Sequence, residues 1–147
     1  MRSKVDFPNL NERQPDGKRD DGSAYRVLVV DDSMFIAKQI TQYLTSEGFN
    51  IVGTAGDGAE AIEKYKELFP KIDLVTMDIT MPNVDGISAL EQILEFDSNA
   101  CVVMISALGK QDLVKKALLL GAKNYIVKPL DREKVLERIR TDRKSVV

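Results

Sequence analysis

Five short apolar runs alternate with segments of helical periodicity along this 147-residue chain, and this alternation constrains the chain to an α/β fold. The runs read VLVV, IVGTA, LVTM, VVMI and YIV, without a regular polar alternation. Nearly continuous apolar strands are typical of a parallel sheet that helices cover on both faces. Because crossovers between parallel strands are right-handed, we predict a doubly wound, flavodoxin-like sheet of five parallel strands in the order 2-1-3-4-5.

The elements follow from the apolar periods and from the residues that interrupt them. Strands are expected over 26–31, 50–55, 72–77, 101–105 and 123–127, and helices over about 33–47, 57–69, 110–120 and 131–140, with a further helix that carries Ile87, Leu90, Ile93 and Leu94. Residues 1–24 show neither period, so we expect a mobile polar extension there. The predicted domain covers 25–140, and 141–147 form a polar tail.

Composition limits the classes of function. A net charge of −2 gives no general reason to expect nucleic-acid binding. No apolar segment approaches the roughly 20 residues that span a bilayer, and none resembles a signal peptide, so we expect a cytoplasmic protein without membrane insertion. Histidine is absent, which excludes a phosphohistidine carrier and a histidine general base. Acid-base and ligand chemistry must therefore come from oxygen.

Reactive side chains follow four of the predicted strands at the point where each strand ends. Asp31 and Asp32 follow the first strand, and Asp78 follows the third. Ser106 follows the fourth strand, and Lys128 follows the fifth. Since the carboxyl ends of parallel strands meet at one edge of the sheet, we expect these side chains to converge there.

Three of these residues predict a metal site. Adjacent acids ahead of a helix, such as Asp31 and Asp32, can also serve only to cap the helix, with a negative charge that interacts favourably with the helix dipole. With Asp78 beside them, like-charge repulsion would raise at least one pKa unless a cation intervenes. A hard, oxygen-only site of this kind suits Mg²⁺.

Asp78 is the candidate nucleophile of the site. A carboxylate can attack phosphorus to give an aspartyl phosphate, and a bound metal screens the approach of the two anions. The Lys128 ammonium and the Ser106 hydroxyl are suitable partners for the remaining phosphoryl oxygens. Either of these two residues alone would be an ordinary loop residue.

Four separated motifs resemble the receiver domains of bacterial response regulators. They are DDS after the first strand, MDITMPNVDG around the third, SALG after the fourth and GAKNYIVKP around the fifth. They occur in the order that the family has, and the resemblance covers about 26–140. Among receivers, the chain is most similar to the stand-alone regulators of chemotaxis.

The resemblance implies a role for each site residue. Asp78 would be the phosphoacceptor, and the Thr80 backbone carbonyl would join the three aspartates as a Mg²⁺ ligand. Lys128 would contact the phosphoryl group, and a cis Lys128-Pro129 bond would direct the lysine side chain into the site. Ser106 with Tyr125 would form a switch pair.

The resemblance also implies partners. A histidine kinase of the chemotaxis type would supply the phosphoryl group, and a flagellar motor switch protein would bind the phosphorylated form, with a phosphatase as a further partner. Thr80 and Leu108 flank the route of a hydrolytic water, and neither is a carboxylate or amide that would orient it. Dephosphorylation is therefore expected to be modest. The chain would assist its own phosphotransfer and dephosphorylation rather than act as an enzyme.

Three alternatives share parts of this pattern. An intermediate phosphorelay receiver would bind a phosphotransfer domain instead of a flagellar-switch peptide. An aspartate-nucleophile phosphohydrolase usually carries a second acid two residues after the nucleophile, where Thr80 stands. A flavin-binding protein would need a Ser/Thr/Gly-rich loop after the first strand, where the sequence is DDSMF. The acidic site, rather than the fold, decides against the last of these.

Overall fold

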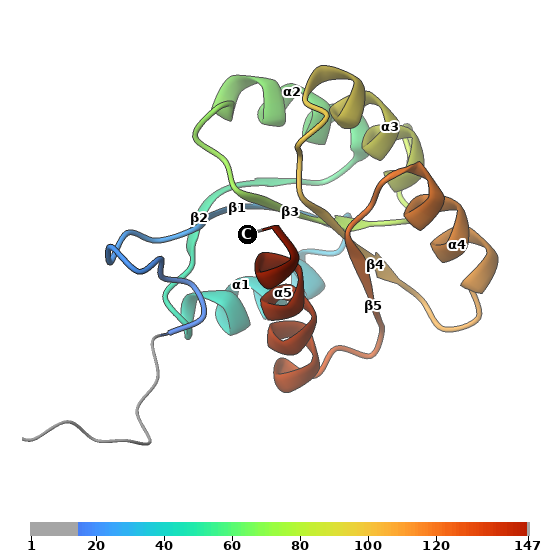
Figure 1. Ribbon diagram of the computed structural model, residues 1–147. Helices are drawn as coiled ribbons and strands as arrows, with labels where there is room; N and C mark the ends of the chain where they lie inside the picture. The colour runs from blue at the N-terminus through green and yellow to red at the C-terminus, as the bar shows by residue number, and fades with distance from the viewer. Residues whose placement is uncertain (1–14, 147) are drawn as a thin grey trace, which may run out of the picture.

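A computed structural model describes residues 15–146 of the chain, with side chains over 15–140. Its centre is a single parallel sheet in the order β2-β1-β3-β4-β5 (Figure 1). The strands are β1 (Arg26–Val30), β2 (Asn50–Ala55), β3 (Leu74–Asp78), β4 (Val102–Ser106) and β5 (Asn124–Val127). The doubly wound fold and the strand order predicted from the sequence are confirmed.

Helices cover both faces of the sheet. The helices α1 (Met34–Thr45) and α5 (Arg132–Val146) lie on one face, and α2 (Gly58–Leu68), α3 (Gly86–Phe96) and α4 (Gln111–Leu120) lie on the other (Figure 1). Successive residues of a strand point to opposite faces. In β1, Leu28 and Val30 therefore pack in the core beneath α2 to α4, while Val27 and Val29 pack in the core beneath α1 and α5.

Polar side chains cap the N-termini of three of the helices. The side chain of Ser33 accepts a hydrogen bond from the backbone N–H of Ile36 at the start of α1. Asp57 and Asp85 accept equivalent bonds at the starts of α2 and α3. These N-caps fix the residue at which each helix begins. The loops between the strands and these helices therefore lie at the carboxyl edge of the sheet.

The register of the parallel strands aligns their carboxyl ends. Val30 pairs with Ala55 in β2 and with Met77 in β3, and Asp78 pairs with Ile105 in β4. The residues that follow β1 and the last residues of β3 and β4 therefore share one edge of the sheet.

The last helix extends further than the sequence predicts. The expected end lies near residue 140, with a polar tail over 141–147, whereas the backbone of α5 is helical to Val146. The apolar period stops near Ile139, but the following TDRKSV contains neither Gly nor Pro to end the helix.

The segment before β1 also differs from the predicted mobile extension over its described part. Residues 1–14 lie outside the described residues. Over 15–24, the Gly17 N–H donates to the Glu47 carbonyl at 2.7 Å, and the Gly17 carbonyl accepts from the Tyr25 N–H at 2.8 Å. Asp16 is buried, and its carboxylate lies 3.1 Å from the Arg140 guanidinium on α5. This N-terminal strap, residues 15–24, is therefore packed against the amino edge of the domain.

No helix between residues 15 and 146 combines the length and the apolar composition needed to cross a membrane.

Candidate functional site

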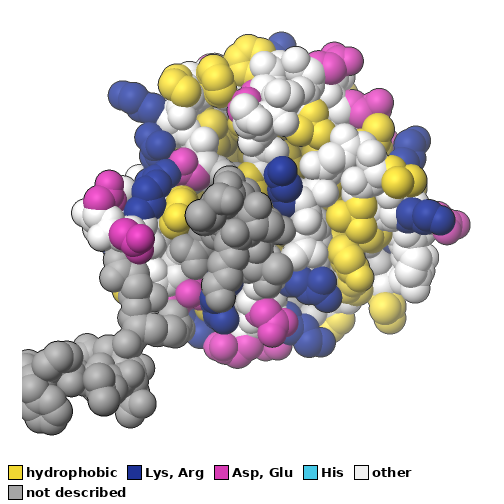
Figure 2. All heavy atoms as spheres, in the orientation of Figure 1, with side chains coloured by type: hydrophobic (Ala, Val, Ile, Leu, Met, Phe, Trp, Pro, Cys, Tyr) yellow, Lys and Arg dark blue, Asp and Glu magenta, His cyan; other side chains and the backbone are white. Residues whose placement is uncertain are grey.

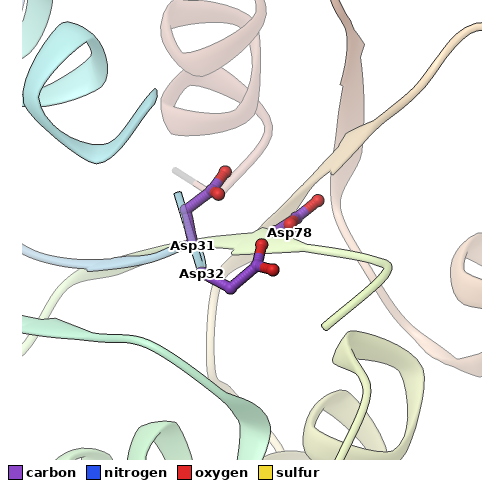
Figure 3. Close-up of side chains that lie close together, drawn as sticks. All are labelled: Asp31, Asp32 and Asp78. Carbon is purple, nitrogen blue, oxygen red and sulfur yellow. The ribbon is translucent and has the colours of Figure 1, made fainter. Parts of the chain in front are cut away.

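Three carboxylates converge at the carboxyl edge of the sheet. Asp31 and Asp32 directly follow β1, and Asp78 is the last residue of the neighbouring β3. Figure 3 shows the three side chains reaching from these strand ends into one region. One oxygen from each carboxylate lies within 4.8 Å of the other two. The convergence expected from the sequence is present, and Asp32 is the exposed member of the cluster.

Asp31 is held by the backbone around it. Its N–H donates to the Ala55 carbonyl in β2 at 3.0 Å, and its Oδ1 accepts from the Ser33 N–H at 2.9 Å. The other oxygen, Oδ2, is buried and has no hydrogen-bond partner among the residues that the structure describes. A buried carboxylate oxygen without a donor is costly, and a cation would compensate it.

A single ammonium group reaches two of the carboxylates. Lys128 Nζ lies 3.4 Å from Asp78 Oδ1 and 3.6 Å from Asp31 Oδ2. The Lys128 N–H donates to the Ser106 carbonyl at 2.7 Å, which ties the end of β5 to the end of β4. The Lys128-Pro129 peptide bond is cis, as the resemblance predicts.

The electrostatics of the cluster favour a bound cation. Burial raises the pKa of Asp78 to about 7; the negative charge of Asp31 adds to the rise, and the Lys128 ammonium opposes it. Burial likewise raises the pKa of Asp31, while the hydrogen bond from Ser33 and the Lys128 charge oppose that rise. One ammonium therefore does not fully compensate the buried carboxylates.

The residues present fit Mg²⁺. The donor set is made of hard carboxylate oxygens, and it is small enough to leave positions for water and a phosphoryl oxygen. The buried Asp31 Oδ2 and the raised pKa values are the physical signs that a further positive charge, besides that of Lys128, would be stabilised there.

The predicted switch residues border a cavity next to the cluster. Ser106 is buried, and its hydroxyl donates to the neighbouring Ala107 carbonyl at 2.9 Å. Ser106 and Tyr125 both line a cavity of about 360 Å³ between α4 and β5. The two positions expected to tune dephosphorylation, Thr80 and Leu108, are exposed.

Comparison with known proteins identifies the family. A model of the response regulator receiver domain matches residues 27–140. The chain belongs to this family. It is a CheY-like receiver domain.

Similar proteins extend over most of this receiver domain. The chemotaxis protein CheY of Treponema pallidum is 70% identical over 95% of this chain and 96% of its own length. CheY of Bacillus subtilis is 50% identical over 79% of this chain and 95% of its own length. A crystal structure of the CheX-CheY-BeF3-Mg²⁺ complex from Borrelia burgdorferi matches with a TM-score of 0.85 and 59% identity, over 88% of this chain and 97% of that one.

Two residues that support the receiver site, Gly86 and Asn83, are not revealed by the sequence patterns. The Gly86 N–H donates to the Ile79 carbonyl at 2.8 Å, which closes the loop after β3. Asn83 has a positive φ of 65° and donates from its side chain to Asp57 at 3.1 Å. The motif MDITMPNVDG contains both residues, but only the folded chain shows that they connect the Asp78 loop to the starts of α2 and α3.

Proposed function

We propose that this receiver domain is a single-domain response regulator in which Asp78 accepts a phosphoryl group from a histidine kinase. The observation that carries the proposal is the position of Lys128 Nζ, 3.4 Å from Asp78 and 3.6 Å from Asp31. An ammonium in that place can contact an oxygen of a phosphoryl group on Asp78, and the acidic cluster can hold a cation on the other side.

Asp31, Asp32 and Asp78, with the backbone carbonyl of Thr80, would hold Mg²⁺. When bound, the ion screens the carboxylates from the incoming anionic group. The Asp78 carboxylate attacks the phosphorus of a phosphohistidine, so that a P–O bond forms and the P–N bond of the donor breaks. The electron pair of that bond leaves with the imidazole of the kinase, and the Lys128 ammonium stabilises the charge on a phosphoryl oxygen.

Dephosphorylation is proposed to depend partly on a partner. Thr80 and Leu108, which border the route to Asp78, are exposed and carry neither a carboxylate nor an amide to orient water. Slow intrinsic hydrolysis would leave room for a phosphatase. The Borrelia burgdorferi relative forms a complex with CheX, which supports a CheX-like protein as a candidate partner of this chain.

The output surface is proposed to be the side formed by α4 and β5. Figure 2 shows hydrophobic side chains gathered on the right of the molecule, where these elements lie in Figure 1. The exposed apolar residues there are Leu108, Leu118, Leu119, Leu120 and Val127. Movement of the Ser106 hydroxyl toward a phosphoryl group would open space for the Tyr125 ring and change this surface.

The CheY relatives support a role in chemotaxis. For that role we propose a cytoplasmic protein with a chemotaxis histidine kinase upstream and a flagellar motor switch protein downstream, as the resemblance to the family implies. A direct binding comparison separates this role from that of a phosphorelay intermediate. The phosphorylated chain should bind a flagellar-switch peptide more tightly than the unphosphorylated chain does. Preferential binding to a phosphotransfer domain would instead support the phosphorelay role.

Phosphorylation itself can be tested by mass measurement. Incubation with acetyl phosphate and Mg²⁺ should add the mass of one phosphoryl group to the wild type and none to Asp78→Asn. Asp112→Asn is a matched control, because Asp112 is an exposed residue in the first turn of α4 and lies outside the cluster. Equal modification of Asp78→Asn and the wild type would remove Asp78 from its assigned role.

A further inference from the structure

Tyr125 borders two hollows of the surface. On one side it borders the cavity of about 360 Å³ that Ser106 also lines. On the other side it borders a smaller hollow of about 230 Å³, which is lined by Lys134, Glu137 and Arg138 of α5. The Tyr125 side chain packs against the core beneath α2 to α4, with the cavity shared with Ser106 next to it and a charged surface of α5 at its edge.

One of these α5 side chains lies over the ring. The guanidinium carbon of Arg138 is 5.0 Å from the centre of the Tyr125 ring, within the range of a cation–π contact. Both residues are half-buried, so the contact is less screened by solvent than one between fully exposed groups.

Asn124 holds the arginine in this position. Its Oδ1 accepts from the Tyr125 N–H at 2.8 Å and from the Arg138 guanidinium at 3.4 Å. Its side-chain amide donates to the Arg138 carbonyl at 3.3 Å. The same side chain therefore connects the backbone of β5, the backbone of α5 and the guanidinium that covers the ring.

We infer that Arg138 is a positioning residue that retains the Tyr125 ring in its present position, in contact with the Arg138 guanidinium, and so sets how readily the switch responds. Moving the ring into the cavity beside Ser106 would separate it from the guanidinium. The contact therefore opposes the inward arrangement before phosphorylation. This inference rests on the proposed function, because it assigns a role within the Ser106–Tyr125 switch.

The test uses the full chain labelled with fluorotyrosine and observed by ¹⁹F NMR. Tyr125→Phe identifies the Tyr125 signal among those of the four tyrosines. Beryllofluoride with Mg²⁺ serves as the phosphoryl mimic, and its concentration at half-conversion of the signal is measured. A titration midpoint is used because removal of a nearby charge also changes the signal position directly.

Arg138→Met removes the cation and keeps a side chain of similar length. The midpoint is expected to fall about two- to five-fold, because the inward arrangement no longer competes with the contact. Arg138→Lys keeps the charge and should give a smaller fall. Lys134→Met is the matched control, since Lys134 lines the same hollow on the same helix and its replacement also removes one positive charge. Its midpoint should stay that of the wild type.

The outcomes separate the two claims. An unchanged midpoint in Arg138→Met, or an equal fall in Arg138→Met and Lys134→Met, would overturn the role of Arg138 while the proposed switch stands. A wild type whose Tyr125 signal does not respond to beryllofluoride and Mg²⁺ would overturn the proposed switch, and the role of Arg138 with it. If Arg138→Met fails to fold, Arg138→Gln replaces it with the same expected fall.

Discussion

Gly86, the first residue of α3, lies directly against the main-chain carbonyl of Asp78. A β-carbon at residue 86 would overlap the carbonyl oxygen of Asp78 and approach Ile79 Cα to 2.9 Å. Because these are backbone atoms, no side-chain rotation can relieve the overlap. The start of α3 therefore packs directly on the backbone of the candidate nucleophile.

Gly86→Ala is expected to displace Asp78 and slow its phosphorylation by acetyl phosphate. A displacement of about 1 Å at a reacting group can cost on the order of 10²-fold in rate. Gly56→Ala is the matched control, since a β-carbon there meets only the flexible Glu60 carboxylate at 3.8 Å. Equal phosphorylation rates in the two variants would show that the Gly86 contact does not position Asp78.

Lys128→Ala is expected to separate metal binding from switching. The variant retains all three carboxylates and should bind Mg²⁺, because Lys128 is a counter-charge in the cluster rather than an oxygen ligand. It should lose the change at Tyr125 that phosphorylation produces in the wild type. Mg²⁺ titration and NMR of the same sample measure both properties. Normal switching in the variant would contradict the role given to the ammonium.

Asp32→Ala should remove most of the affinity for Mg²⁺, because a sparse shell completed by water depends on each carboxylate. Asp32 is the exposed carboxylate of the cluster, so its replacement should affect folding less than replacement of buried Asp31. Isothermal titration with Mg²⁺, alongside a thermal melt without metal, distinguishes the two effects. An unchanged titration would exclude Asp32 as a ligand.

The metal-free protein should lose stability as the pH rises from about 4 to above 7. The pKa of Asp78 is raised from 3.8 to about 7 in the folded state by burial and by Asp31, against the opposing Lys128 charge. Between these two values the folded state binds more protons than the unfolded state, so the free energy of unfolding falls with increasing pH. The contribution of Asp78 is fully present below its unfolded pKa and lost above its folded pKa.

Asp78→Asn should reduce this pH dependence. Thermal melts in chelator from pH 4 to 8 should show a higher melting temperature for the variant than for the wild type at pH 8, and a smaller difference at pH 4. Saturating Mg²⁺ should raise the wild-type value at pH 8, because a ligand of the folded state stabilises it. A parallel pH dependence in both chains would contradict the raised pKa.

The sheet and the acidic cluster could be predicted because they depend on local patterns. A strand that ends at Asp78 has its carboxyl end at a known edge, whatever the rest of the chain does. The contact of Gly86 with Asp78 and that of Arg138 with Tyr125 could not be predicted, because they depend on how helices sit against the sheet. The sequence shows which residues follow the strands, and the three-dimensional packing shows which residues support them.

The N-terminal strap, residues 15–24, was not predicted for a related reason. The ion pairs that hold it to the domain are polar, so no apolar period marks them, and they join residues distant in sequence. The Arg140 guanidinium lies 3.1 Å from buried Asp16, and Arg19 forms an ion pair with Asp73 just before β3. The strap thereby connects α5 to the amino edge of the sheet.

Deletion of residues 1–24 is therefore expected to lower the melting temperature, although the composition of this segment alone predicts little change. The backbone bond between Gly17 and Glu47 and the two ion pairs together should contribute about 1–3 kcal/mol. In a chain of this size each kcal/mol corresponds to about 2–4 °C in melting temperature.

Deletion of residues 1–14 is the comparison, because it leaves these three contacts in place. Asp16→Asn in the full chain should reproduce part of the loss, since it removes the charge that faces Arg140. Equal melting temperatures for the two truncations would show that the strap contacts contribute nothing to stability.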